Sequence, residues 1–96
     1  MNKNEILTNL QQYKERNSSG YLIRRIGIFG SVARGSSTIQ SDVDIVVELE
    51  RQDLFDLIGI KQDLEERLNC PVDIVSYRQK MNPFLKRRID NEAIYV

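Results

Sequence analysis

Two aspartates, Asp42 and Asp44, stand at the start of an apolar run in the segment SDVDIVVEL. Successive side chains of a β-strand point to opposite faces, so both carboxylates lie on one face and Val43 on the other. Two such charges repel each other unless a cation lies between them, and all-oxygen ligands suit a hard divalent ion. The pair therefore predicts a site for Mg²⁺ or Mn²⁺. A solvated D-x-D at a strand edge is the simpler alternative.

A third carboxylate, Asp73, has a similar setting in the segment PVDIVSY. If the two strands are neighbours, Asp73 can join Asp42 and Asp44, and the three carboxylates can hold two divalent ions about 3.5–4 Å apart. Such a pair supports in-line displacement at phosphorus, because one ion neutralises a triphosphate while the other lowers the pKa of an attacking hydroxyl. The chain contains no histidine, so the role of general base falls to Asp73.

Gly30 and Ser31 end the preceding apolar run and supply groups that suit a phosphate. Glycine lets the backbone approach a ligand closely, and a short helix after it would present N–H groups to an anion. Ser31 adds a hydroxyl donor, and Arg34, one turn later, can reach the phosphates or brace the loop. The chain has no G-x-x-x-x-G-K segment, so a P-loop is excluded. A Gly-Ser turn without function is the alternative, since such turns are common.

The composition limits the classes of function. The 96 residues predict a single domain over 1–96, and 14 basic and 14 acidic residues give zero net charge. No overall basic field attracts nucleic acid, so direct nucleic-acid binding is not expected. No apolar run is long enough for a membrane span, and the N-terminus lacks the core of a signal peptide. The single cysteine, Cys70, excludes an internal disulfide and favours a cytoplasmic location.

The predicted elements place these side chains on a small sheet. Helices are expected over residues 3–17, 54–68 and 83–91, with one turn at 31–35, and strands over 21–29, 42–49, 72–77 and 94–96. Turn residues at 17–20 are expected to end the first helix, and the polar residues 36–41 to form a loop. Asp53 and Asn82 are expected to cap helices. The order predicts an α/β (α+β) fold, a small mixed β-sheet flanked by helices.

Two further groups of side chains have more than one interpretation. The apolar face of the helix 54–68 is expected to consist of Leu54, Phe55, Leu57, Ile58, Leu64 and Leu68. Within it, Phe55 and Ile58 are expected in the core, although contact with a partner is an alternative. The basic run Lys86, Arg87 and Arg88 is expected to be a solvated face, but it can also meet nucleotide phosphates or an acidic partner.

The spacing of the motifs resembles a known signature. Gly30-Ser31, ten residues and then Asp42-Val43-Asp44 match the G-S-x10-D-x-D pattern of the DNA polymerase β-like nucleotidyltransferases. The string GSVARGSSTIQSDVDIVV is similar to the minimal nucleotidyltransferase (MNT) group, and the resemblance covers nearly the whole chain. It implies the polymerase β-like fold, Mg²⁺ at Asp42 and Asp44, the third carboxylate at Asp73, and triphosphate contacts from Gly30 and Ser31.

The resemblance also implies an activity and a partner. Family members move a nucleoside monophosphate from a triphosphate to a hydroxyl, and many stand-alone MNT proteins are antitoxins of HEPN-type ribonuclease toxins. They attach AMP from ATP to a tyrosine of the toxin, which implies a possible hetero-oligomer. Silencing by binding alone and adenylylation of a small molecule remain alternatives. The acceptor, the preferred base, the number of AMP units, the oligomeric state and the roles of Arg34 and the basic run are left open.

Overall fold

The computed structural model describes residues 2–35 and 42–96, with the backbone alone for residues 17–19. The helices are α1 (Lys3–Tyr21), α2 (Gly30–Arg34), α3 (Leu54–Leu68) and α4 (Pro83–Glu92). The strands are β1 (Ile23–Phe29), β2 (Val43–Leu49), β3 (Val72–Ser76) and β4 (Ile94–Tyr95). This is the predicted order of elements; the loop expected at 36–41 lies outside the described residues.

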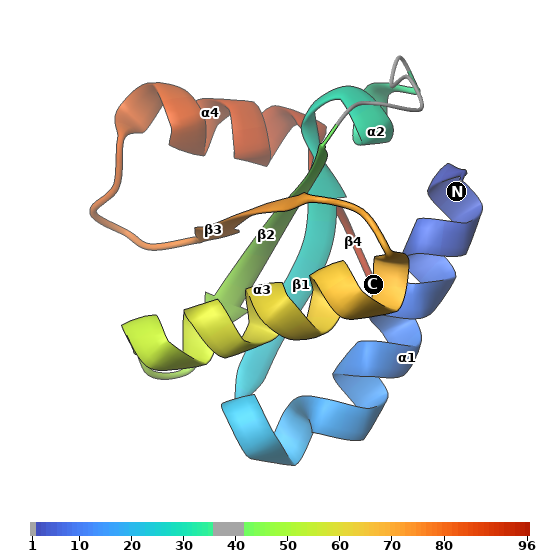
Figure 1. Ribbon diagram of the computed structural model, residues 1–96. Helices are drawn as coiled ribbons and strands as arrows, with labels where there is room; N and C mark the ends of the chain where they lie inside the picture. The colour runs from blue at the N-terminus through green and yellow to red at the C-terminus, as the bar shows by residue number, and fades with distance from the viewer. Residues whose placement is uncertain (1, 36–41) are drawn as a thin grey trace.

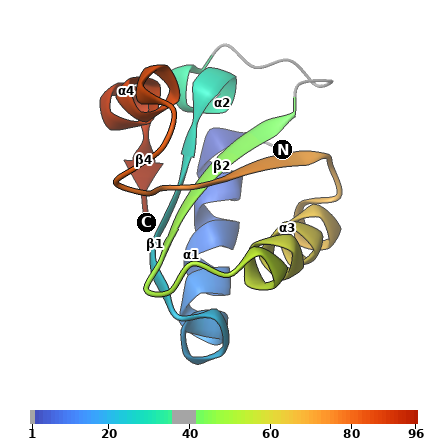
Figure 2. The ribbon, with the colours of Figure 1, turned by 90° about the vertical axis from the view of Figure 1, so that its left-hand side faces the viewer.

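The four strands form one mixed sheet in the order β3-β2-β1-β4. Strand β1 is antiparallel to β2 and β4, whereas β2 and β3 are parallel. Helices α1 and α3 cover one face of the sheet, and α4 lies over the other face (Figures 1 and 2). The predicted small mixed sheet with helices on its faces is therefore confirmed.

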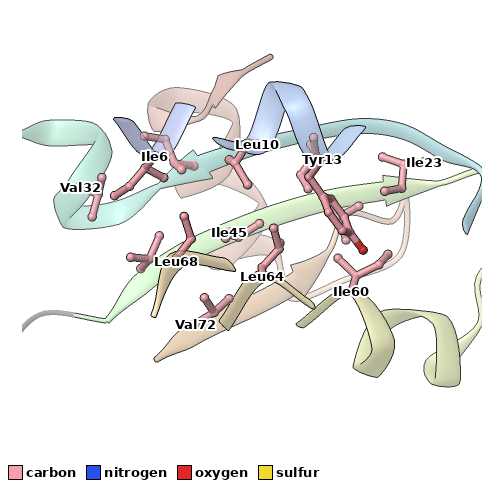
Figure 3. Packing of buried hydrophobic residues seen from close by; sticks show 14 of the residues in the cluster. Ile6, Leu10, Tyr13, Ile23, Val32, Ile45, Ile60, Leu64, Leu68 and Val72 are labelled. Carbon is pink, nitrogen blue, oxygen red and sulfur yellow. The ribbon is translucent and has the colours of Figure 1, made fainter. Parts of the chain in front are cut away.

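The larger core lies between the sheet and the helix pair α1 and α3 (Figure 3). Ile6 and Leu10 of α1 and Leu64 of α3 are almost completely buried there, against Ile45 of β2. A smaller core on the α4 face contains Phe29, Val46 and Ile89. Alternate side chains of β2 therefore point into different cores, Ile45 into the larger and Val46 into the smaller. Helix α4 covers only the smaller core.

Side-chain caps fix the starts of the two C-terminal long helices, as predicted. Asp53 accepts hydrogen bonds from the backbone N–H groups of Phe55 (2.8 Å) and Asp56 (3.3 Å) at the start of α3. Asn82 caps α4 in the same way: its side chain accepts hydrogen bonds from two backbone N–H groups of the first turn, which begins with Pro83. Among the described residues, no helix combines the length and the apolar character that crossing a membrane would require.

The predicted end of α1 at residues 17–20 is wrong. The helix continues through Tyr21 and ends at Leu22, which has a left-handed backbone with φ of 54°. A glycine inside a helix costs only about 1 kcal/mol, so Gly20 is a weak stop. Tyr21 packs against the larger core, and this burial favours the extra helical turn. Strand β1 consequently begins at Ile23 rather than at Tyr21.

The predicted apolar face of α3 is also partly wrong. Leu64 and Leu68 are buried as expected, together with Ile60, but Phe55 is 83% exposed and Ile58 is 44% exposed. At about 100° per residue, the stripe through Ile60 and Leu64 leaves Phe55 and Ile58 on the opposite side of the helix. Leu54, in the first turn, is 68% exposed. The helix therefore presents apolar side chains to solvent as well as to the core.

Candidate functional site

The parallel pairing of β2 and β3 brings two of the predicted site residues together. Asp44 lies directly opposite Asp73 in the ladder, between the pairs Val43–Val72 and Ile45–Ile74. Val43 and Val72 are buried in the larger core, so alternation places the two aspartates on the α4 face of the sheet. The grouping of these aspartates depended on the condition that the two strands are neighbours, and β2 and β3 meet this condition.

The carboxylate of Asp44 is half-buried among other charges. Its pKa is raised mainly by burial and then by the negative charge of Asp73, with a smaller effect of Asp42. Arg88 and Arg34 oppose this shift and lower the pKa of Asp44. Asp42 and Asp73 are both exposed. Both of the other predicted carboxylates therefore act on Asp44 electrostatically, although Asp42 lies just before the first residue of β2.

These carboxylates do not form a compact set of ligands among the described residues. Within residues 2–35 and 42–96, no three His, Cys, Asp or Glu side chains are placed so that they could hold a metal ion. Their chemistry nevertheless fits a hard cation, because the donors are all oxygens and because burial, and then the charge of Asp73, disfavours the ionised form of Asp44. The metal-binding roles of Asp42, Asp44 and Asp73 stay predictions.

Gly30 is packed against Asp44 at the junction of β1 and α2. Phe29, the preceding residue, pairs with Asp44 across the antiparallel ladder. A Cβ atom on Gly30 would overlap the Oδ2 oxygen of Asp44 and lie 3.1 Å from its Cγ. The backbone of Gly30 is also left-handed, with φ of 72°. Glycine is thus required here both by its backbone conformation and by the proximity of the carboxylate.

A glutamate that the sequence did not single out fixes this turn. The N–H of Gly30 donates a hydrogen bond to Oε2 of Glu92, at 3.1 Å. The guanidinium of Arg34 donates to both carboxylate oxygens of Glu92, at 3.0 and 3.1 Å. Glu92 is the last residue of α4, whose C-terminal end lies beside α2 (Figure 1). Of the two roles predicted for Arg34, these contacts support bracing; contact with phosphates stays a prediction.

The other residues at this junction are Ser31 and Arg88. Ser31 is half-buried in the first turn of α2, which has no side-chain cap, and its phosphate-binding role stays a prediction. Arg88 of α4 places its guanidinium carbon 5.9 Å from the centre of the Phe29 ring. Sequence reasoning noted Arg88 only as part of a basic run and missed Glu92, because the segment NEAIYV carries no motif.

Removal of the Glu92 carboxylate is expected to destabilise the turn. The Glu92→Ala variant loses both the hydrogen bond from Gly30 and the ion pair with Arg34, so its free energy of unfolding should fall by about 1 kcal/mol, a value that allows for the partial exposure of the pair. Urea unfolding measures the loss, and Asn91→Ala, at the exposed neighbouring position, is the control. Equal unfolding midpoints for the two variants would show that Glu92 does not brace the turn.

Comparison with known families identifies the fold. The family described as "Nucleotidyltransferase domain" matches residues 10–96. The chain belongs to this family. The signature of Gly30-Ser31 and Asp42-Val43-Asp44 was therefore a correct guide, and the predicted enzyme class, nucleotidyltransferase, is confirmed.

The individual relatives cover most of the chain. A Methanocaldococcus jannaschii protein with the provisional name protein adenylyltransferase is 45% identical over 75 residues, which are 77% of this chain and 80% of the relative. Protein adenylyltransferase MntA of Thermococcus cleftensis is 32% identical over 93 residues, which are 96% of this chain and 93% of the relative. Each is similar to this chain over four fifths or more of its own length.

Solved structures are also similar to this chain over most of its length. A structure provisionally described as a minimal nucleotidyltransferase is 35% identical, with a TM-score of 0.78 over 98% of this chain and 95% of that chain. A toxin–antitoxin structure with AMP-PNP is 25% identical, with a TM-score of 0.73 over 99% of this chain and 72% of that chain. A complex of a tri-AMPylated Shewanella oneidensis HEPN toxin with its MNT antitoxin shares the fold, at 20% identity and a TM-score of 0.66 over 94% of this chain and 70% of that chain.

Proposed function

We propose that this nucleotidyltransferase transfers AMP from ATP to a tyrosine hydroxyl of a HEPN-type toxin in the cytoplasm, and so acts as an antitoxin. The observation that carries the proposal is the position of Asp44, which lies opposite Asp73 in the sheet and against Gly30. Adenylyl transfer to protein is supported by the names of the relatives, and a nucleotide and a toxin partner are supported by the toxin–antitoxin structures.

The carboxylates are the proposed metal ligands. Asp42 and Asp44 would hold Mg²⁺, or Mn²⁺ in its place, and Asp73 would complete a site for two ions. The ions would supply positive charge to the triphosphate and to the departing pyrophosphate. The raised pKa of Asp44 supports this assignment, because the fold disfavours the ionised carboxylate unless a cation compensates for burial and for Asp73.

The other residues bind ATP and move a proton. Ser31 and the turn that begins at Gly30, whose own N–H is bonded to Glu92, hold the β- and γ-phosphates. Asp73, which is exposed to an incoming partner, accepts the proton of the tyrosine hydroxyl. The hydroxyl oxygen forms a bond to the α-phosphorus as the bond from that phosphorus to the bridging oxygen breaks, and pyrophosphate leaves. The protein does little covalent chemistry, so positioning and charge stabilisation account for the rate.

A second candidate function is silencing of the toxin by binding alone. It is favoured by the side chains of Leu54 and Phe55, which are 68% and 83% exposed at the start of α3. Exposed apolar groups of this kind suit a protein partner. Transfer to a small molecule is the third possibility, and it differs in where the nucleotide is found after the reaction.

Intact mass spectrometry of a purified HEPN-type toxin separates these functions. After incubation with this protein, Mg²⁺ and ATP, we expect the toxin to gain mass in steps of one AMP. The Asp42→Asn and Asp73→Asn variants should produce no such gain. A silenced toxin of unchanged mass would instead support binding alone, and an AMP adduct found only among small molecules would identify a different acceptor.

A further inference from the structure

The basic run Lys86, Arg87 and Arg88 is divided by the geometry of α4. The ammonium of Lys86 lies 5.8 Å from the centre of the Tyr77 ring and donates a hydrogen bond to the carbonyl of Gln79. Arg88 instead lies over the ring of Phe29, next to Gly30 in the chain. Arg87 lies between them and is exposed. Only one member of the run is therefore placed at the junction of β1 and α2.

The helix carries Arg88 and Glu92 on the same side, one turn apart. Glu92 bonds to Gly30 and Arg34, so this side of α4 faces the candidate phosphate-binding turn. Arg88 also lies over the ring of Phe29, and Phe29 pairs with Asp44 in the ladder. Arg88 therefore lies near both the turn and the carboxylate.

The two arginines at this junction, Arg34 and Arg88, differ in their contacts with carboxylates. In the described part of the chain, the ion pairs are Arg25–Glu48 and Arg34–Glu92. Glu92 thus satisfies the charge of Arg34, whereas Arg88 has no carboxylate at ion-pair distance among these residues. Contact with an aromatic face leaves the N–H groups at the edge of a guanidinium available to an anion. Arg88 is the cation better placed to accept a new anionic partner.

We propose that Arg88 binds the triphosphate of ATP. Its guanidinium would contact the β- or γ-phosphate next to the Gly30-Ser31 turn. The inference rests on the proposed function and adds a binding residue to it. A guanidinium suits this role because its planar array of donors matches phosphate oxygens in a bidentate arrangement. The cation also reduces the repulsion between an incoming triphosphate and the three aspartates, in addition to any metal ion that they hold.

Binding of nucleotides to variants tests this proposal without a toxin. Arg88→Ala is expected to bind AMP-PNP in the presence of Mg²⁺ about tenfold more weakly than the wild type, the effect of losing one hydrogen bond to a charged group. Binding of AMP, which lacks the β- and γ-phosphates, should change much less. Arg87→Ala is the matched control and should resemble the wild type, and Arg88→Lys, which keeps the charge without the planar donors, should be intermediate.

The outcomes separate this inference from the proposed function. Calorimetric titration with equal affinities of the wild type and Arg88→Ala for AMP-PNP would overturn the inference, as would an equal loss of affinity for AMP-PNP and AMP. Lack of AMP-PNP binding by the wild type would overturn both proposals. Tight binding that depends on Arg88, without any mass gain of the toxin, would support the ligand role and contradict the transferase function. Thermal unfolding of each variant establishes that it is folded.

Discussion

Replacement of Asp44 by asparagine is expected to lower the rate of AMP transfer by about 10²–10³-fold or more, the range found when one preorganised charge-stabilising group is removed. Asparagine has nearly the same size, so its side chain can keep the place of Asp44 against Gly30. The variant should therefore fold, but it lacks the charge that a divalent ion requires. Glu66→Gln, which removes an exposed carboxylate from α3, is the control and should retain full activity.

The same substitution should change stability in a direction set by the pKa of Asp44. Burial and Asp73 raise that pKa in the folded protein, so the folded state binds more protons than the unfolded state just above the ordinary carboxyl pKa. Stability without metal consequently falls as the pH rises through this range. At neutral pH, we expect metal-free Asp44→Asn to unfold at a temperature equal to or higher than that of the wild type. The difference between the two unfolding temperatures should decrease as the pH is lowered toward the ordinary carboxyl pKa.

Thermal unfolding with and without Mg²⁺ completes the test of Asp44. Mg²⁺ should raise the unfolding temperature of the wild type and of Glu66→Gln, because a ligand that binds the folded state stabilises it. It should leave Asp44→Asn nearly unchanged. Transfer at the wild-type rate by a folded Asp44→Asn protein would exclude the proposed metal site, and so would an equal effect of Mg²⁺ on the two proteins.

Replacement of Gly30 by alanine is expected to have the second largest effect, and Gly35 provides a matched control. Both glycines have left-handed backbones, with φ of 72° and 75°, so alanine introduces a strain of about 1–2 kcal/mol at either position. At Gly30 the new Cβ also overlaps the carboxylate of Asp44, whereas at Gly35 no atom of the described residues beyond the adjacent backbone lies within 4 Å of it. The difference between the variants therefore isolates the displacement of Asp44.

The expected results follow from this difference. Gly35→Ala should lose stability through strain alone and keep nearly full transfer activity. Gly30→Ala should lose about a further 1–3 kcal/mol from overpacking. Its transfer rate should fall by about 10²-fold, because displacement of a catalytic group by about 1 Å has an effect of that size. Urea unfolding and initial rates measure both quantities, and equal transfer rates for the two variants would contradict the proposed role of the Asp44–Gly30 contact.

Local sequence signals were sufficient for much of the fold. The caps at Asp53 and Asn82 were recognised because each depends on hydrogen bonds to residues two or three positions away. The strands β2 and β3 were recognised by short apolar runs. The pairing that places Asp44 beside Asp73 was only a condition at that point, because strand order has no local signal, and the structure meets it. Gly30 was singled out by type and position, and the structure supplies the steric reason.

The errors and omissions concern contacts between distant parts of the chain. The end of α1 depends on burial of Tyr21 in the core, which residues 17–20 do not reveal. Phe55 and Ile58 are as apolar as core residues, and only the packing of α3 shows that they are exposed. Glu92 and Gly30 are 62 positions apart, so their hydrogen bond has no local signature.

ATP labelled at a single phosphorus tests most directly the proposal that this nucleotidyltransferase attaches AMP to a toxin. The purified HEPN-type toxin is incubated with this protein, Mg²⁺ and ATP that carries the label at either the α- or the γ-phosphorus. We expect label on a toxin tyrosine from α-labelled ATP alone, and none with Asp44→Asn. Label from the γ-position, or a silenced toxin without label, would contradict adenylyl transfer by this site.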